Sequence, residues 1–555
     1  MSHARPALLL AALLFVGPAS PRDAPQRKGN FGPGVTIPKG QVTPHWFADD
    51  TKFWYRNDLK GGARKFVLVD AEAGKREPAF DHAKLAASLS KAAGTEYKPD
   101  RLPFGDIEFA DGLKTLRFET AGKKWTCDLS TYECSDVGPA GKRPAAKEPE
   151  PEDEDPDSPE VTEQQPEQRQ PKGRFQPDRP RDAPSPDGKW VAFVKDHNVF
   201  LRPTDGGEPV QLSKAGVEGN AFGMLSWSPD GKALVGFRIE PGDNKEVYLV
   251  ESSPAGGGRA KLSSRPYPLP GDKFTAYEPW VFDLANKTAT KVETDRLDLD
   301  RPRVRWAKDG KHFTYEKVDR GHQRFRLVEV DAQTGKAHNL IDEKTETFIW
   351  TAHTENVNIP LVTWLDKFDE LIYSSEKDGW RHLYLIDAKT GTIKNCITQG
   401  DYVVRGINHI DEAKRQVWFR ASGKNPVQDP YFVHHYRVNF DGTDLVALTE
   451  GDGTHTVQYS PARKYVVDTY SRVDLAPVHE LRRCSDGKLV CKLEEADISD
   501  LKAGGWEPPE VFVAKGRDGA TDIWGIICRP RNFDPKKKYP VIEQIYAGPQ
   551  GSFMP

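Results

Sequence analysis

The chain contains the stretch Trp227-Ser228-Pro229-Asp230-Gly231-Lys232, in which an aromatic residue precedes a polar turn and a β-rich run follows the turn. Asp and Gly provide the backbone geometry that a tight turn between two strands requires. The same pattern occurs eight times in the chain. The other occurrences span residues 46–55, 107–118, 185–190, 306–311, 364–369, 409–419 and 459–464. Recurrence of a short pattern at intervals of several tens of residues indicates a repeat architecture.

A second pattern accompanies the first and consists of a strand that runs into a turn containing Asp and Gly. It is clearest at residues 67–75, 327–336 and 383–392. The runs that flank these turns alternate with period two, which predicts hairpins. Each repeat is therefore expected to be a small antiparallel sheet, and radial repetition of such sheets is a β-propeller. We predict an all-β fold with eight blades, in which the Trp and Phe residues of the repeat pack between blades.

The composition of the 555-residue chain excludes several classes of function. It has 79 Lys and Arg residues against 83 Asp and Glu residues, a net charge of −4 and 37% hydrophobic residues. This near-neutral balance, without a long basic run, argues against nucleic acid or an anionic membrane as the main partner. The sequence has no HExxH, CxxC or phosphate-binding Gly-rich motif, so no metal or other cofactor is expected. His434 and His435 are adjacent and would point to opposite faces of a strand, which argues against a metal pair.

Two segments are expected to lie outside the repeats. Residues 1–20 carry one Arg, the apolar run Ala7 to Val16 and a small-residue end, as in a secretory signal peptide. The apolar run is much shorter than the about 20 residues that span a bilayer, so we expect export to the periplasm or the exterior and no membrane span. Residues 138–184 are rich in Pro and acidic residues and are expected to be a disordered insert. The insert separates the first blades, in 21–137, from the remainder of the propeller, in 185–505.

Six cysteines are too few for a disulfide scaffold in a chain of this length. Two pairs share one spacing and are candidates for hairpin disulfides in an oxidising compartment, namely Cys127 with Cys134 and Cys484 with Cys491. In the second pair, a turn centred on Asp486-Gly487 is expected to place Cys484 opposite Leu489, so that Cys491 is diagonal. Cys396 and Cys528 are interpreted as small buried thiols.

The pattern changes after residue 509, where the repeats stop. Residues 511–515 and 521–528 flank a turn at 516–519 and form a predicted hairpin. Residues 536–551 then form a predicted strand that Pro540 enters and Gly548-Pro549 closes, at the edge of a new sheet. Three strands bury too little surface to be stable alone. We therefore interpret residues 506–555 as the incomplete start of a second domain.

Two motifs carry a family resemblance. They are Ser375-Glu376-Lys377-Asp378-Gly379-Trp380-Arg381-His382-Leu383-Tyr384, and Lys537-Lys538-Tyr539-Pro540 leading to Tyr546-Ala547-Gly548-Pro549. With them the chain resembles the dipeptidyl peptidase IV branch of the prolyl oligopeptidase family of serine peptidases, from about residue 185 to residue 555. The resemblance implies a propeller, usually eight-bladed, in front of an α/β-hydrolase domain whose Ser, Asp and His cut peptides, often after Pro or Ala.

The resemblance implies roles for two residues of this chain. Tyr546 matches the Tyr whose hydroxyl helps to hold the oxyanion of the tetrahedral intermediate, as a preorganised donor. Glu218 stands where dipeptidyl peptidases carry consecutive Glu residues that grip the free amine of the substrate, although only one Glu is present in Val217-Glu218-Gly219-Asn220. The G-x-S-x-G pattern of the nucleophile occurs nowhere in the sequence, and neither the catalytic Asp nor the His can be assigned.

The leading hypothesis is that this is the propeller part of an exported serine peptidase, with peptides as substrates and the catalytic triad missing from the chain. The propeller would admit peptides and exclude folded proteins. The alternative is a noncatalytic periplasmic propeller that binds a protein or peptide partner, because one fold hosts many functions. The preferred substrate residue, exopeptidase or endopeptidase action, and homo-oligomerisation stay open.

Overall fold

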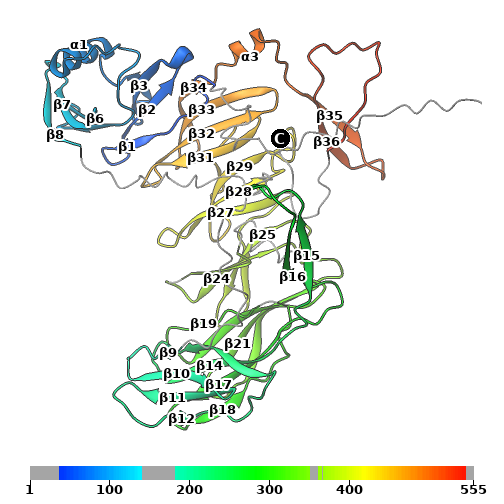
Figure 1. The fold of residues 1–555 in the computed structure, drawn as a ribbon. Coiled ribbons are helices and arrows are strands. Elements are labelled where there is room, and N and C mark those ends of the chain that lie inside the picture. Colours follow the sequence, from blue (N-terminus) through cyan, green and yellow to red (C-terminus); the bar gives the residue numbers. More distant parts are fainter. Residues whose placement is uncertain (1–36, 141–181, 300, 350–359, 366, 545–555) are drawn as a thin grey trace, which may run out of the picture.

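The computed structural model describes residues 37–140, 182–299, 301–349, 360–365 and 367–544. This part of the chain is almost entirely β and contains eight four-stranded antiparallel sheets and two separate two-stranded hairpins (Figure 1). The all-β prediction is confirmed for these residues. Residues 1–20, Tyr546 and most of the predicted insert lie outside them.

The eight sheets are numbered here in chain order, and within each sheet the strands are neighbours in sequence order. Sheets 1 to 4 consist of β1 His45–Phe47, β2 Lys52–Asp58, β3 Arg64–Asp70 and β4 Lys75–Pro78; β5 Ile107–Ala110, β6 Thr115–Thr120, β7 Lys123–Asp128 and β8 Cys134–Pro139; β9 Ala183–Pro184, β10 Trp190–Lys195, β11 Asn198–Pro203 and β12 Val210–Gln211; and β13 Ala221–Trp227, β14 Ala233–Glu240, β17 Ala276–Asp283 and β18 Thr288–Lys291. The predicted insert therefore overlaps the end of β8 and all of β9.

Sheets 5 to 8 consist of β19 Arg305–Trp306, β20 His312–Val318, β21 Arg324–Asp331 and β22 Ala337–Lys344; β23 Val362–Leu365, β24 Glu370–Ser375, β25 His382–Asp387 and β26 Ile393–Cys396; β27 Val403–Asp411, β28 Gln416–Ser422, β29 Val433–Asn439 and β30 Val446–Ala447; and β31 Thr454–Tyr459, β32 Tyr465–Arg472, β33 Leu475–Arg483 and β34 Leu489–Glu495. The two hairpins are β15 Glu246–Glu251 with β16 Lys261–Pro266, and β35 Glu510–Lys515 with β36 Asp522–Ile527. Among the residues that the structure describes, the helices are α1 His82–Ala93, α3 Ser499–Ala503 and the short 3₁₀ helix η1 Lys60–Gly62.

Each of the eight sequence repeats forms the turn between the first and second strands of one sheet. In the repeat at Trp227, the Ser228 hydroxyl donates to Asp230 Oδ1 at 2.7 Å and accepts from the backbone N–H of Ala233 at 2.9 Å. Gly231 follows with φ +68, a conformation that residues with a side chain rarely adopt. These bonds replace the ladder bonds that the chain loses at the turn, which explains the recurrence of the motif.

The second pattern forms the turn between the third and fourth strands, as predicted. Asp331 Oδ1 accepts from the backbone N–H groups of Gln333 and Thr334 at 2.9 and 2.7 Å. Asp387 does the same in sheet 6. The carboxylate thus stabilises the turn itself, which is the reason for Asp at this position.

Seven buried hydrophobic clusters join the sheets into one continuous stack. Each cluster takes its residues from two neighbouring sheets, and together they order the sheets 3-4-5-6-7-8-1-2. In the described residues no such cluster joins sheet 2 to sheet 3, which lie at opposite ends of the stack (Figure 1). The sheets are therefore not closed into a ring, and the blade arrangement remains open at this one place.

The aromatic residues of the repeats lie mainly between sheets, as predicted. Phe53 and Phe313 are fully buried, and Trp418 is 4% exposed in the cluster between sheets 7 and 8. Burial of one such side chain stabilises the fold by about 1.5–3 kcal/mol relative to exposure. Sheets 1 and 4 to 8 each contribute residues to two of these clusters, so each of them needs both of its neighbours to bury its apolar residues.

Sheet 8 contacts sheet 1 although the two lie at opposite ends of the sequence. The Glu494 carboxylate is at the centre of this junction and accepts from Tyr55 Oη at 2.8 Å and from Asn57 Nδ2 at 2.6 Å. It also pairs with Lys39 Nζ at 3.1 Å and Arg76 at 3.0 Å. Burial alone would raise the pKa of Glu494, but these hydrogen bonds and charges outweigh it and lower the pKa.

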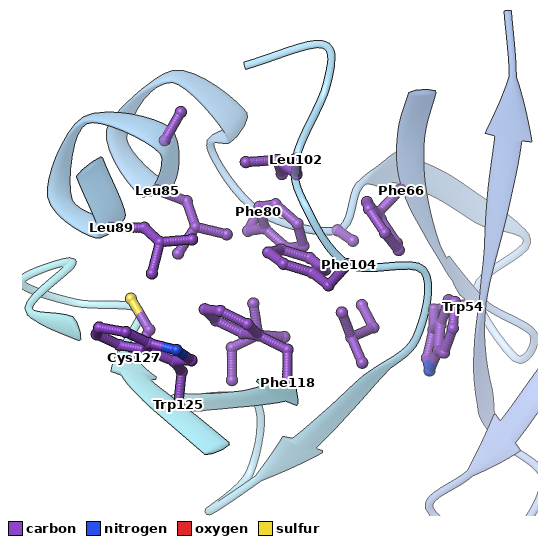
Figure 2. Packing of buried hydrophobic residues seen from close by; sticks show 14 of the residues in the cluster. Trp54, Phe66, Phe80, Leu85, Leu89, Leu102, Phe104, Phe118, Trp125 and Cys127 are labelled. Atoms are coloured by element: carbon purple, nitrogen blue, oxygen red, sulfur yellow. The ribbon is translucent and has the colours of Figure 1, made fainter. Parts of the chain in front are cut away.

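Helix α1 covers the cluster between sheets 1 and 2 and was not predicted. Figure 2 shows Leu85 and Leu89 of the helix pointing toward Phe118 and Trp125 of sheet 2. Asp81 caps the helix by accepting from two backbone N–H groups at 3.0 Å.

The hairpin predicted after residue 509 is confirmed as β35–β36. The strand predicted over 536–551 is wrong for its described part, because residues 536–544 form no strand. Val541 and Ile542 are 89% and 93% exposed there. A strand is stabilised by hydrogen bonds to a neighbouring strand, and residues 536–544 have no such neighbour in the described part of the chain. No helix among the described residues is long and apolar enough to cross a bilayer.

Candidate functional site

The topology places the segments that do not belong to the four-stranded sheets at one end of the sheets. Since strands alternate in direction, the hairpins between second and third strands lie at the same end as the connections from one sheet to the next. We call this end the connection end. It carries the β15–β16 ribbon, inserted between β14 and β17, and the chain that leaves β34 for α3 and β35–β36. Figure 1 shows the ribbon and the β35–β36 hairpin on the same side of the stack.

Glu218 lies at the connection end, at the tip of a two-residue turn between β12 and β13. Val217 and Asn220 pair across the turn, with the Asn220 backbone N–H donating to the Val217 carbonyl at 2.9 Å. Gly219 has φ +74, which permits this tight reversal. The Glu218 side chain is exposed as a result. Among the described residues its carboxylate has no hydrogen bond or ion pair, so it is available to a ligand.

A buried amide holds this turn in place. Asn198, at the start of β11, donates to the Gly216 carbonyl at 3.0 Å and accepts from the Gly216 backbone N–H at 2.9 Å. The Ser213 hydroxyl donates to the same amide oxygen at 2.9 Å. Asn198 is 8% exposed and Ser213 2%. The position of Glu218 therefore depends on a buried hydrogen-bond network and not on the turn alone.

A second acid, Glu278 of β17, is linked through Arg238 to the loop that carries Glu218, and both of its carboxylate oxygens have partners. Arg238 contacts Glu278 at 2.8 Å and reaches the carbonyl of Ala215 at 3.5 Å, so it links the acid to the Glu218 loop. Lys291 pairs with the other carboxylate oxygen at 2.6 Å, and Trp280 Nε1 donates at 3.0 Å. Burial would raise the pKa of Glu278, but the hydrogen bonds from Lys291 and Trp280 and the charge of Arg238 outweigh it and lower the pKa. The Glu278 carboxylate therefore has a structural role, whereas the Glu218 carboxylate is exposed and can pair with a ligand.

The chemistry available to Glu218 is recognition of a cation. A carboxylate is an acceptor only, and it pairs with ammonium or guanidinium groups. An exposed ion pair contributes only about 0.2–1 kcal/mol, so Glu218 alone would discriminate weakly between charged and uncharged ligands. The neighbours of Glu218 in the chain, Val217 and Gly219, carry no second carboxylate.

Two buried histidines of the sheets, His382 and His434, are structural. His382 Nδ1 contacts Thr398 Oγ1 at 3.0 Å and its Nε2 contacts the Gly400 carbonyl at 2.9 Å. His434 makes the equivalent contact with Thr449 at 3.3 Å, and its Nε2 contacts Gln428 Oε1 at 2.7 Å. Both nitrogens of each ring are occupied, which leaves no lone pair for a metal ion or for base catalysis.

Asn198 and Ser213 occupy the same positions in sheet 3 as these His and Thr residues do in sheets 6 and 7. In all three sheets the hydroxyl also accepts a backbone N–H from the third strand, at 2.9 to 3.0 Å. Sequence reasoning missed this device. Its signal is an apolar residue followed by Ser or Thr directly after the fourth strand, as in Leu212-Ser213, Ile397-Thr398 and Leu448-Thr449.

His434 and His435 face different surroundings, as expected for adjacent strand residues. The ring of His435 contacts the carbonyl of His455 at 3.3 Å, away from Thr449 and Gln428. No group of three or more metal-binding side chains occurs within the described ranges. Arg238 and Glu278 were also missed by the sequence reasoning, because their pairing depends on the register of β14 against β17.

The two cysteine pairs have different geometries. Cys127 lies directly opposite Cys134 in the β7–β8 register. The expectation that Cys484 lies opposite Leu489 is wrong, because the register pairs Arg482 with Leu489. The turn closes between Arg483 and Lys488, which leaves Cys484 inside it.

Cys484 and Cys491 belong to different clusters. Cys484 packs between sheets 7 and 8, whereas Cys491 packs between sheets 8 and 1, on the other face of sheet 8. Cys528 is exposed, so its interpretation as a buried thiol is wrong, and Cys396 is partly buried.

Comparisons with known proteins agree with the resemblance. Residues 160–477 match the family model described as the dipeptidyl peptidase IV (DPP IV) N-terminal region. The chain is 26% identical over 407 residues to a probable dipeptidyl-aminopeptidase B of Tuber melanosporum, covering 66% of this chain and 44% of the relative. It is 25% identical over 402 residues to the protein of that name from Aspergillus oryzae, covering 66% and 44%. The chain thus spans less than half the length of these relatives.

Two solved structures are also similar to this chain. One is dipeptidyl peptidase 4 of Porphyromonas gingivalis, with 17% sequence identity and a TM-score of 0.45, and the match covers 90% of this chain and 66% of that chain. The other is a putative dipeptidyl aminopeptidase IV of Bacteroides ovatus, with 18% sequence identity and a TM-score of 0.45, and the match covers 92% of this chain and 67% of that chain. The family model matches more than half of the sequence. This chain therefore belongs to the family of dipeptidyl peptidase IV N-terminal regions.

Proposed function

We propose that this chain is the propeller part of an exported serine peptidase of the dipeptidyl peptidase type, which controls the access of peptides to a catalytic Ser-Asp-His domain. The sequence has no G-x-S-x-G nucleophile motif, so a hydrolase domain outside this sequence would supply the triad. Residues 506–555 would be the start of that domain, and the segment 1–20 would direct export. Membership of the family and the peptidase names of the relatives support this function over a noncatalytic binding propeller.

The order of the sheets supports a closed, eight-bladed propeller. A ring of eight sheets needs eight interfaces, and seven of them are present as buried clusters. The missing interface lies between sheets 2 and 3. We propose that these two sheets meet in the working protein, because closure would cover the terminal sheet faces that the open stack leaves without a neighbour.

Glu218 is the observation that carries the substrate proposal. Its carboxylate is exposed at the connection end, the same end from which the chain continues toward β35–β36. We assign it to the free amine of a peptide substrate. Tyr546, by resemblance, would donate its hydroxyl to the oxyanion in the hydrolase domain.

A binding experiment tests the role of Glu218. Saturation-transfer NMR would compare the peptide Ala-Pro-Ala with its N-acetylated form on this chain. We expect the free amine to bind more tightly by a few-fold, as one exposed ion pair allows, and Glu218→Gln to abolish the difference. Glu208→Gln, which changes another exposed Glu on the same sheet, is the matched control. Equal binding of the two peptides to the unmutated chain would refute the assignment.

A further inference from the structure

Cys127 and Cys134 occupy a pair of positions that sheets 5 and 6 fill with apolar residues. In sheets 5 and 6, the residues that flank the Asp turn are Val330 opposite Ala337, and Ile386 opposite Ile393. The turn of sheet 2 has the same backbone bonds. The Asp128 N–H donates to the Glu133 carbonyl at 3.0 Å, and the Asp128 carbonyl accepts from the Tyr132 N–H at 2.6 Å. The two thiols are therefore the counterparts of these apolar pairs.

The register makes this pair suitable for a covalent bond. Asp128 and Glu133 form a hydrogen-bonded pair, and paired positions alternate along an antiparallel ladder. Cys127 and Cys134 are therefore a non-hydrogen-bonded pair, in which the Cα atoms are about 4.5 Å apart and the side chains approach most closely. Disulfides span Cα separations of about 4.4–6.8 Å, so the bond can form without movement of the backbone.

We propose that Cys127 and Cys134 are a redox site, which closes to a disulfide by exchange with an oxidant that itself contains a disulfide, such as glutathione disulfide. The bond ties β8, the edge strand of sheet 2, to β7. Sheet 2 is the terminal sheet of the stack, and its edge strand has one hydrogen-bonded neighbour in the described part of the chain. An edge strand of this kind frays and pairs with other strands unless it is fixed.

The surroundings assign different roles to the two thiols. Cys127 is fully buried, and Figure 2 shows its sulfur between Trp125 and Leu89 of α1. Cys134 is only partly buried. A hydrogen bond from the Cys127 thiol to the ionised Cys134 sulfur, together with one from Ser88, would stabilise the Cys134 thiolate and lowers the pKa of Cys134 against the cost of burial. The same bond raises the pKa of Cys127.

The reaction then proceeds in two steps that balance. The Cys134 thiolate attacks one sulfur of the oxidant, and the other sulfur of the oxidant leaves as a thiolate. Cys127 loses its proton and attacks the Cys134 sulfur, which expels the second thiolate of the oxidant. Two protein thiols are oxidised to one disulfide, and one oxidant disulfide is reduced to two thiols.

Peptide mapping of the full chain tests the site. The protein is equilibrated in oxidised or reduced glutathione, unfolded, alkylated and cut with trypsin. Both cysteines fall in the fragment 125–142, whereas Cys484 and Cys491 fall in separate fragments and serve as the internal control, since they share the same spacing. We expect the fragment 125–142 to resist alkylation only after oxidation, with Cys484 and Cys491 alkylated in both samples. Alkylation of Cys127 and Cys134 in the oxidised sample, or linkage of either to another cysteine, would overturn the proposal.

Hydrogen exchange tests whether the bond fixes the edge strand. Amides of β8 should exchange several-fold more slowly in the oxidised than in the reduced protein, and Cys134→Ser should remove this redox dependence. Cys491→Ser, in a different cluster, should keep it. Equal exchange of β8 in the two redox states of the unmutated protein would show that the pair does not tie the strand.

Discussion

At the scale of single residues, burial changes the pKa values of the histidines His434 and His435 and makes the stability of the fold depend on pH. Burial lowers the pKa of His434 to about 3 and that of His435 to about 3, and the neighbouring charges of His455 and Arg420 add to the effect. Both residues are therefore neutral in the folded state at pH values where the unfolded chain, with a pKa of about 6.5, takes up protons. The contribution of these two histidines to the free energy of unfolding is therefore fully present above pH 6.5 and is lost as the pH falls from 6.5 toward 3.

Replacement of one of these histidines should change that pH dependence. Each contributes a slope of up to about 1.4 kcal/mol per pH unit to the free energy of unfolding between its two pKa values. Urea unfolding of His434→Gln between pH 6.5 and 4.5 should show a smaller loss of stability than the unmutated chain. The control is His338→Gln, since the side chain of His338 is 59% exposed. An unchanged slope in His434→Gln would contradict the assignment of a buried neutral ring.

At the scale of secondary-structure elements, some features of the fold could be predicted from the sequence and others could not. The turn motifs located all eight sheets, because Ser, Asp and Gly act through local hydrogen bonds that any isolated stretch can reveal. Register was harder, and the position of Cys484 was wrong because the first strand leaves the ladder at Arg483, two residues earlier than the Asp486-Gly487 pair suggests. Pairings across strands, such as Arg238 with Glu278, depend on contacts distant in sequence and could not be predicted from one chain.

Helix α1 was missed although its signals are present in the sequence. Asp81 precedes the helix, Leu85 and Leu89 have helical spacing, and Gly94 ends it with φ +68. We expect Asp81→Ala to lower the free energy of unfolding by about 0.5–2 kcal/mol, because two backbone N–H groups lose their acceptor. Chemical denaturation would measure this change, with Asp205→Ala, in an exposed loop of sheet 3, as a comparison. A cost no larger than that of the comparison would mean that the cap contributes nothing.

At the scale of the molecule, the junction of sheet 8 with sheet 1 holds the two ends of the described sequence together. Glu494 is almost completely buried and satisfies Tyr55, Asn57, Lys39 and Arg76. Glu494→Ala would leave these groups without their acceptor and should lower the free energy of unfolding by about 3 kcal/mol, as for other buried ion pairs that lose one partner.

A surface pair gives the matched control for that substitution. Glu510 pairs with Arg529 at 2.6 Å, but both side chains are largely exposed. Glu510→Ala should therefore cost less than about 1 kcal/mol in the same denaturation experiment. Similar costs for the two variants would show that the junction between sheets 8 and 1 does not depend on Glu494.

The sheet order and the exposed carboxylate of Glu218 at the connection end both support the proposal of a propeller that faces a hydrolase domain. The fold class and the family followed from the sequence because repeats and motifs are local patterns. The support of the site by Asn198 and Ser213 became visible only in three dimensions.

The most direct test of the central claim is the coding sequence beyond codon 555 at the source locus. The account predicts an open reading frame that continues into a G-x-S-x-G motif followed by an Asp and a His, the residues that complete the triad. A stop codon directly after codon 555 would contradict it, because no catalytic domain would then follow the propeller in the same chain.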